Sequence, residues 1–249
     1  MKVFSVFGIT QSGKTTTIEN ILTELKKRRY TVGSVKEIHF EEFAIDTEGS
    51  NTDRHKKAGS QLVTAWGYYE TDILYNRRIS LDEILKFYDF DYVALEGVTD
   101  ISAPKIITAH NTQEADERFD DTVFAFSGRL ANSLKEYKGL PVINAITERE
   151  KLVDLIEEKV FARLPDFPEE CCGNCGFSCR ELSGKILRGT ARREDCVIAD
   201  GSIRLTIDGI EIPMVPFVQN LLHNAVTGVA KELEGYRKNG ELVVKIKGS

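Results

Sequence analysis

A glycine-rich segment near the beginning of the chain, residues 8–15 (GITQSGKT), constrains its fold more than any other feature. It fits the phosphate-loop pattern G-x-x-x-x-G-K-[ST]. The apolar run at residues 3–7 precedes it, and apolar residues recur at helical spacing after it, at Ile18, Ile21, Leu22 and Leu25. A strand, a glycine loop and a helix in this order predict the start of a buried parallel sheet that binds a nucleoside triphosphate.

The residue types in this loop suit phosphate chemistry. Gly8 and Gly13 let backbone N–H groups curl around phosphate oxygens, and the N-terminus of the following helix adds its positive dipole end. Lys14 is predicted to contact the β- and γ-phosphates, and the Thr15 hydroxyl is predicted to bind Mg²⁺. The other loop and helix residues predicted to bind the nucleotide are Gln11, Ser12 and Thr16.

Two acidic residues are candidates for the same site. Glu96 ends the apolar run at residues 92–95, where a strand-end acid holds magnesium through water or positions an attacking water. Asp46 lies in a loop and is a candidate switch residue that approaches the magnesium or the γ-phosphate. An ordinary strand-end acid and an ordinary loop acid are the alternative interpretations. With Lys14, these two acids form the predicted catalytic group.

Apolar runs and helical stretches alternate along the first two thirds of the chain. Strands are predicted at residues 31–35, 61–65, 92–95, 106–109, 123–126 and 142–144. Ser80 and Glu83 form a capping box at one helix start, and another helix is predicted at about residues 148–161. This alternation predicts an α/β fold with a doubly wound, mostly parallel sheet.

A second, smaller part of the chain follows a stretch with two prolines and three acids at residues 164–170. We expect three parts: a nucleotide-binding domain (1–165), a four-cysteine module (166–200) and a small α+β module (201–249). In the last module we expect a hairpin that turns at Asp208-Gly209, an amphipathic helix at 217–229 and a strand at 242–246.

The first 145 or so residues resemble the MobB family, the molybdopterin-guanine dinucleotide biosynthesis protein B family of GTP-binding P-loop proteins. The resemblance rests on the phosphate loop with Thr16 and on later segments, namely Val35-Lys36, Asp46-Thr47-Glu48-Gly49-Ser50, Asp53-Arg54-His55, Ala58-Gly59, Glu96-Gly97 and Pro104-Lys105-Ile106. It implies an accessory role in attaching GMP to molybdopterin, with GTP as the ligand and a homodimer as the working form. The expected partners are molybdopterin and its guanylyltransferase.

The resemblance also implies roles for individual residues. Asp46, Arg54 and His55 are expected to line the nucleotide or pterin side of the site, and Glu96 to be the strand-end acid. A histidine expected near Lys36 is displaced to His39, so pterin binding through that loop stays open. Guanine follows from the resemblance only, because no N-K-x-D segment is present.

Asn144 is the nearest candidate for contact with the base. If the nucleotide is GTP, Lys14, Thr15 and Glu96 predict slow GTP hydrolysis.

All five cysteines fall between Cys171 and Cys196. Cys172, Cys175, Cys179 and Cys196 supply four soft thiolates, which suit an iron-sulfur cluster or zinc. A 4Fe-4S cluster is favoured, because structural zinc sites prefer two C-x₂-C pairs and the last two cysteines form none. The segment resembles the small 4Fe-4S domain of corrinoid iron-sulfur proteins. Cys171 is the alternative to Cys172 as a ligand.

Composition narrows the function classes. The formal net charge is −6 and the one basic run, residues 26–29, stands at a predicted helix end, so no nucleic-acid partner is expected. No signal peptide and no membrane-spanning run is expected, which predicts a cytoplasmic protein. We therefore expect a GTP-binding accessory protein of molybdenum or tungsten cofactor maturation. The alternative is a nucleotide-driven metallocluster chaperone or reductive activator of a metalloenzyme.

Overall fold

The computed structural model describes residues 1–40, 42–166, 175–196, 203, 205–207, 210–212, 214, 216–237 and 242–244. These residues fall into two compact units. The first comprises residues 1–100, 105–119 and 124–160, and the second comprises residues 101–104, 120–123 and the described part of 161–249. The division into three parts made from the sequence stays a prediction.

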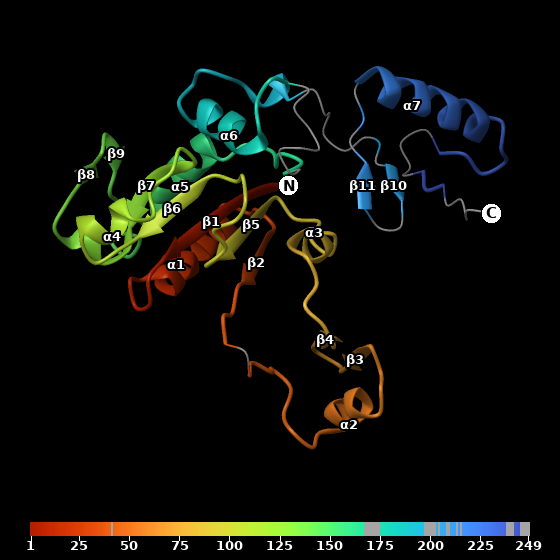
Figure 1. Cartoon of the computed structure of the whole chain (residues 1–249), viewed down its shortest axis with the longest axis horizontal. Helices are drawn as coiled ribbons and strands as arrows, with labels where there is room; N and C mark the ends of the chain where they lie inside the picture. The colour runs from red at the N-terminus through yellow and green to blue at the C-terminus, as the bar shows by residue number, and fades with distance from the viewer. Residues whose placement is uncertain are drawn as a thin grey trace. The chain divides into compact units, whose positions relative to one another are not determined.

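The first unit is built on a five-stranded sheet in the order β2-β5-β1-β6-β7 (Figure 1). Its strands are β1 (Lys2–Gly8), β2 (Val32–Lys36), β5 (Tyr92–Glu96), β6 (Lys105–Thr108) and β7 (Val123–Ser127). The β2–β5, β5–β1 and β1–β6 pairs are all parallel. Every residue of β5, β6 and β7 is buried, as expected for the interior of a parallel sheet. The predicted, mostly parallel α/β fold is confirmed.

Helix α1 (Lys14–Lys27) follows β1 directly and buries an apolar stripe of Ile18, Ile21 and Leu25. It packs against β1 and β5 and lies alongside α5 (Arg149–Lys159), the helix predicted at residues 148–161. Arg28, the C-cap residue of α1, joins the two helices. Its guanidinium is 2.7 Å from Asp154 Oδ1 and 2.6 Å from Glu157 Oε2. The basic run therefore ends the helix as predicted.

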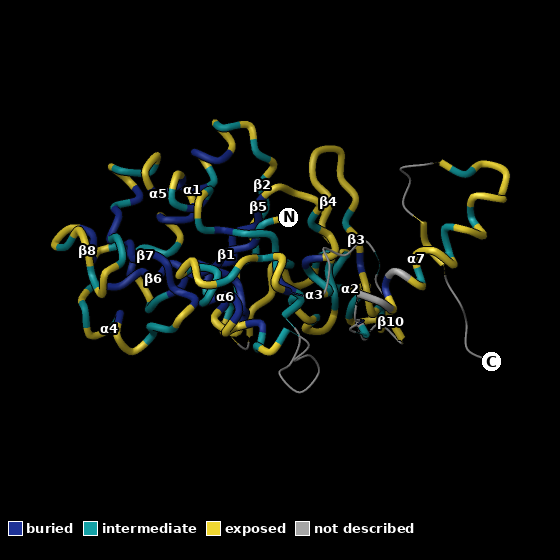
Figure 2. The backbone as a smooth tube through the Cα atoms, turned by 90° about the horizontal axis from the view of Figure 1, so that it is seen from above, coloured by how far each residue is buried: buried dark blue, intermediate teal, exposed yellow. Residues whose placement is uncertain are grey.

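Between β2 and β5 the chain makes a long excursion, and we call residues 42–78 the arm. The arm contains α2 (Asn51–Lys57) and an antiparallel hairpin of β3 (Leu62–Trp66) and β4 (Thr71–Tyr75). Much of the hairpin is drawn as exposed in Figure 2, in contrast to the buried strands β1, β6 and β7. Helix α3 (Leu81–Leu85) returns the chain toward β5 and begins with the predicted capping box.

After β6 come α4 (Thr112–Asp116), β7, a 3₁₀ helix η1 (Gly128–Asn132) and a small hairpin of β8 (Glu136–Tyr137) and β9 (Leu140–Pro141). The strand predicted at residues 142–144 is wrong, because the segment makes one isolated bridge, Phe126 to Val142. The ladder stops there because the neighbouring strand β7 ends at Ser127 and the chain turns into η1 at Gly128, which has φ 73°.

The second unit contains α6 (Cys179–Leu187), with a capping box at Ser178 and Glu181, and a 3₁₀ helix η2 (Arg193–Asp195). An antiparallel hairpin of β10 (Leu205–Ile207) and β11 (Ile210–Ile212) and the helix α7 (Pro216–Lys231) follow as predicted. The expected turn, Asp208-Gly209, lies outside the described residues. The strand predicted at 242–246 is not formed over residues 242–244, and residues 245–246 are not described.

Candidate phosphate-binding site

The phosphate loop connects the end of β1 to the first turn of α1, and its backbone requires unusual torsion angles. Gly8 has φ 156° and Gly13, the N-cap of α1, has φ 106°. A Cβ at Gly8 would collide with the Thr108 carbonyl. Gln11 also has positive φ, at 60°, which costs a residue with a side chain about 1–2 kcal/mol. The loop is therefore held in a conformation that the sequence alone does not favour.

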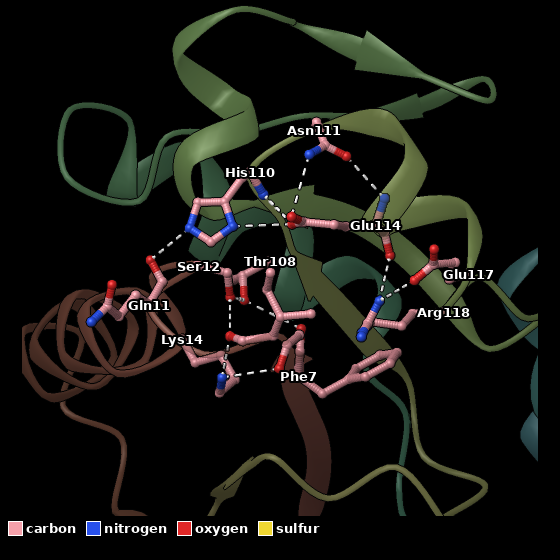
Figure 3. A network of polar contacts seen from close by, with 12 residues as sticks. Phe7, Gln11, Ser12, Lys14, Thr108, His110, Asn111, Glu114, Glu117 and Arg118 are labelled. Carbon is pink, nitrogen blue, oxygen red and sulfur yellow. Dashed lines mark hydrogen bonds and ion pairs between the residues drawn. The ribbon is translucent and has the colours of Figure 1, made fainter.

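Hydroxyl groups fasten this loop to the neighbouring strand β6 (Figure 3). Ser12 Oγ donates to the Ile9 carbonyl at 2.8 Å and accepts the Thr108 hydroxyl proton at 2.7 Å, while Thr108 Oγ1 also lies 3.3 Å from the Phe7 carbonyl oxygen. Ser12 and Thr108 are buried. These bonds give the predicted loop residue Ser12 a supporting role, with its side chain turned toward the sheet.

Lys14 folds back over the loop. Its Nζ donates to the carbonyls of Gly8 at 2.9 Å and Ile9 at 2.5 Å. Burial lowers the pKa of Lys14, and the nearby positive charges of Lys36 and Arg118 lower it further, while Glu96 opposes this shift. An ammonium beside two other cations is a favourable partner for a polyanion.

Thr15 and Glu96 meet beside the loop, from α1 and the end of β5. Thr15 Oγ1 donates to Glu96 Oε1 at 2.7 Å, and Lys36 Nζ, at the end of β2, lies 3.0 Å from the same oxygen. The Glu96 side chain is 11% exposed. The spacing of residues 15 and 96 in the sequence does not by itself require this meeting. It follows from β1 and β5 being parallel neighbours.

Gly128 and its neighbour Arg129, which the sequence analysis did not single out, support the loop from the other side. Gly128 has φ 73°, and a Cβ there would collide with the Ser12 carbonyl. The Arg129 N–H donates to that same carbonyl at 3.2 Å. The only available sequence signal was a glycine directly after a buried strand, Ser127-Gly128.

Asn144 and Thr16, two further predicted nucleotide ligands, lie in different settings. The Asn144 side-chain oxygen accepts backbone N–H groups from Ile146 and Thr147, and its amide donates to Asn132 Oδ1 at 3.2 Å. Thr16 is exposed in the first turn of α1. The Asn144 side chain is thus held by its own turn, and one of its two amide hydrogens bonds Asn132 in η1.

The three predicted residues of the arm are held by local contacts. Asp46 accepts hydrogen bonds from Ser50 and Thr52 at 2.8 Å each, and its other oxygen lies 2.8 Å from Lys56 Nζ. The Lys56 ammonium lowers the pKa of Asp46 to about 2. Arg54 and His55 are exposed on α2. In the described part of the chain, the interactions found for Asp46 join it to the arm and not to the phosphate loop.

With this geometry in view, the comparisons identify the family. Residues 3–128 match the family described as molybdopterin guanine dinucleotide synthesis protein B, or MobB. The chain belongs to this family. The match includes the phosphate loop, the arm and Glu96, and it ends before the first cysteine.

Curated relatives of the MobB chain agree. A protein of Methanocaldococcus jannaschii, assigned as a molybdopterin-guanine dinucleotide biosynthesis adapter protein, is 28% identical over 253 residues, covering 99% of this chain and 97% of the relative. An adapter protein so assigned in Bacillus subtilis is 29% identical and covers 57% of this chain and 85% of its own length. The archaeal similarity extends beyond the family match, through the cysteine segment.

Solved structures support the same fold. The crystal structure of Bacillus subtilis MobB superposes with a TM-score of 0.55 at 24% identity, covering 66% of this chain and all of that one. A second Bacillus subtilis MobB structure gives 0.52 at 22% identity, with the same coverage. These likenesses concern the fold.

None of the helices in the described residues has the length and apolar character that a membrane span requires.

Three of the predicted cluster ligands of this MobB chain lie in the described residues. Cys179 and Cys196 are buried with Leu164 and Leu182 in one apolar cluster, and Cys175 packs against it. In the part of the chain that the structure describes, no group of three cysteine, histidine or acidic side chains is arranged to hold a metal ion. Cys171 and Cys172 lie outside the described residues.

Proposed function

We propose that this chain is a GTP-binding adapter in the formation of molybdopterin guanine dinucleotide. The observation that carries the nucleotide part is the 2.7 Å contact between Thr15 Oγ1 and Glu96 Oε1 beside the phosphate loop. A P-loop threonine and a strand-end acid are the pair that P-loop proteins bring to magnesium. Membership of the MobB family supports the adapter role.

The residues present fit Mg²⁺, which prefers hard oxygen ligands and keeps several of its waters. Thr15 would hold it directly and Glu96 directly or through water. Lys36 lies 3.0 Å from Glu96, and magnesium held by Thr15 and Glu96 would share that carboxylate's negative charge. Magnesium supplies charge neutralisation of the β- and γ-phosphates, while Lys14 leaves the Gly8 and Ile9 carbonyls to bind the same phosphates.

Hydrolysis in this proposal is slow, because Glu96 serves the magnesium and is then not available as a general base. Asp46, the other acid predicted to take part, would have to leave Ser50, Thr52 and Lys56 to approach the nucleotide. For the guanine base we propose contact with Asn144, whose second amide hydrogen is not accounted for by its bond to Asn132. Arg54 and His55 are proposed to face the pterin side.

Binding of Mg²⁺·GTP and Mg²⁺·ATP, measured by calorimetry on the full chain, tests this proposal. Lys14→Ala should abolish detectable binding of either nucleotide. Thr15→Ala should weaken binding of Mg²⁺·GTP at least tenfold and remove its dependence on magnesium, whereas Thr15→Ser keeps the hydroxyl and serves as the control. Failure of the wild type to bind either nucleotide would refute the nucleotide function, and equal binding by the wild type and Lys14→Ala would refute its assignment to the phosphate loop.

The proposed partners are a second copy of the chain, the small molecule molybdopterin, and the guanylyltransferase that acts on it. The homodimer is supported by the arm hairpin, where Trp66 is 90% exposed and Tyr68 and Tyr69 are fully exposed. In the described residues β3 and β4 pair only with each other, which leaves hydrogen-bonding edges for another strand. Exposed aromatic residues at such an edge favour burial in an interface.

For the cysteine segment we propose a 4Fe-4S cluster on Cys172, Cys175, Cys179 and Cys196. Support comes from the spacing of the four cysteines and from Cys175, Cys179 and Cys196 packing in or against one small apolar cluster, with Cys172 outside the described residues. The proposed setting is the cytoplasm, where thiols stay reduced. If nucleotide state governs transfer of the cluster or of its electrons, the alternative function, a metallocluster chaperone or reductive activator, replaces the adapter role.

A further inference from the structure

His110 lies between the end of β6 and the N-cap of α4, and its backbone is fixed on both sides. The preceding residue, Ala109, is buried and accepts the Leu130 N–H at 2.8 Å. The following residue, Asn111, caps α4 by accepting the Glu114 N–H at 3.0 Å. The imidazole therefore projects from a rigid point, and Figure 3 shows it directed at the phosphate loop.

Glu114 orients the ring from one side. Its Oε2 accepts the His110 backbone N–H at 2.8 Å and lies 3.1 Å from Nδ1 of the ring. The His110 backbone N–H is the main cause that lowers the pKa of Glu114, and the ring and Arg118 lower it further, against the opposing effect of burial. An ionised carboxylate only accepts hydrogen bonds, so Nδ1 carries a proton in this contact.

The other ring nitrogen, Nε2, lies 3.2 Å from the Gln11 carbonyl oxygen in the phosphate loop. A carbonyl also only accepts, so Nε2 is the donor in this contact. Both ring nitrogens thus face acceptor oxygens, and Nε2 is the one that reaches the phosphate loop. The sequence gives no hint of this contact, because the two residues are 99 positions apart.

The contact determines where the next backbone N–H points. A trans peptide is planar and its C=O and N–H groups point in opposite directions. Because His110 holds the Gln11 carbonyl on the side of the loop that faces α4, the Ser12 N–H points to the opposite side, into the loop. There it donates a long hydrogen bond of 3.4 Å to the Ile9 carbonyl. That distance is beyond the usual range for a backbone hydrogen bond, so the N–H is readily given up to a phosphate oxygen.

We propose that His110 is a positioning residue of the phosphate loop: by donating from Nε2 to the Gln11 carbonyl, it keeps that left-handed peptide in the orientation that presents the Ser12 N–H to the nucleotide's phosphates. This inference rests on the proposed nucleotide function.

Two side chains separate the two ring contacts. In His110→Gln the amide nitrogen takes the place of Nε2 and keeps the donor to Gln11, whereas in His110→Asn it takes the place of Nδ1 and keeps only the donor to Glu114. His110→Leu keeps neither. The affinity for Mg²⁺·GTP should fall about 3–10-fold in His110→Asn and His110→Leu, as expected for one hydrogen bond, and His110→Gln should recover most of it.

A second readout reports on the loop itself. The ¹³C resonance of the Gln11 carbonyl in the nucleotide-free protein should shift in His110→Asn and His110→Leu and return toward the wild-type value in His110→Gln. If the wild type binds nucleotide but all three His110 variants bind it equally well and leave the Gln11 resonance unmoved, this inference is overturned and the proposed function is not. Failure of the wild type itself to bind nucleotide would overturn the proposed function and this inference together.

Discussion

Replacement of Gly128 by alanine tests the packing behind the phosphate loop, and Gly139→Ala is its matched control. Both glycines have φ 73°, so the strain of a left-handed alanine, about 1–2 kcal/mol, is common to the two variants. A Cβ at Gly139 meets nothing within 4 Å. At Gly128 it collides with the Ser12 carbonyl and comes within 2.9 Å of Thr108 Cβ.

The collision adds an overpacking cost of about 1–3 kcal/mol, since neither neighbour is the end of a flexible side chain. We expect Gly139→Ala to lose about 1–2 kcal/mol of stability and Gly128→Ala about 2–5 kcal/mol. Thermal melts followed by far-ultraviolet circular dichroism measure this difference. The single tryptophan, Trp66, lies on the exposed arm and is a poor reporter of the sheet.

Nucleotide binding should separate the variants further. Gly128→Ala displaces the Ser12 carbonyl and with it the loop, so Mg²⁺·GTP affinity should fall at least tenfold, while Gly139→Ala should bind normally. Equal melting temperatures and equal affinities in the two variants would refute the reasoning, because the collision with Ser12 would then have no consequence.

Three other predictions concern the arm and the cysteines. The pKa of Asp46 is about 2 in the folded chain, against about 3.8 when unfolded, so the ionised carboxylate stabilises the fold above pH 3.8 and this stabilisation is lost as the pH falls toward 2. Lys56→Gln should raise the pKa of Asp46, measured by ¹³C titration of the carboxylate. A double variant, Trp66→Ser with Tyr69→Ser, should shift a light-scattering mass from two chains to one, and an unchanged mass would exclude the hairpin as the interface. Anaerobically purified protein should contain about four irons and four sulfides per chain, and stoichiometric zinc without iron would rule out the cluster.

Local sequence signals predicted the elements that depend on neighbours in the chain. The order of β1, phosphate loop and α1 is written in consecutive residues, and the capping box at Ser80 and Glu83 marks α3 for the same reason. Glu96 was found because an apolar strand ends there. Its pairing with Thr15 followed once β1 and β5 were neighbours.

The missed features depend on distant contacts or on weak periodicity. Helix α2 has seven residues and buries none, so no apolar stripe marks it. The strand expected at residues 142–144 is not formed because its neighbour β7 ends at Ser127, which leaves the segment the single bridge of Val142 to Phe126. Gly128 and His110 act on Ser12 and Gln11, each about a hundred positions away, and no pattern around either residue predicts those partners.

The polar groups of the phosphate loop are paired within the protein. The Lys14 ammonium bonds two loop carbonyls, the Thr15 hydroxyl bonds Glu96, and Lys36 neutralises the same carboxylate. On the proposed function, Mg²⁺·GTP would have to replace these bonds, so part of its binding free energy would be used in breaking them. The Gln11 carbonyl and the Ser12 side chain are different, because they bond His110 and Thr108, and the proposed phosphate binding would not have to break these two bonds. The loop therefore combines side chains that would exchange partners, Lys14 and Thr15, with a backbone fixed by His110 and Thr108. Weakening only the bonds of His110 and Thr108 should lower the affinity for GTP without changing its dependence on magnesium.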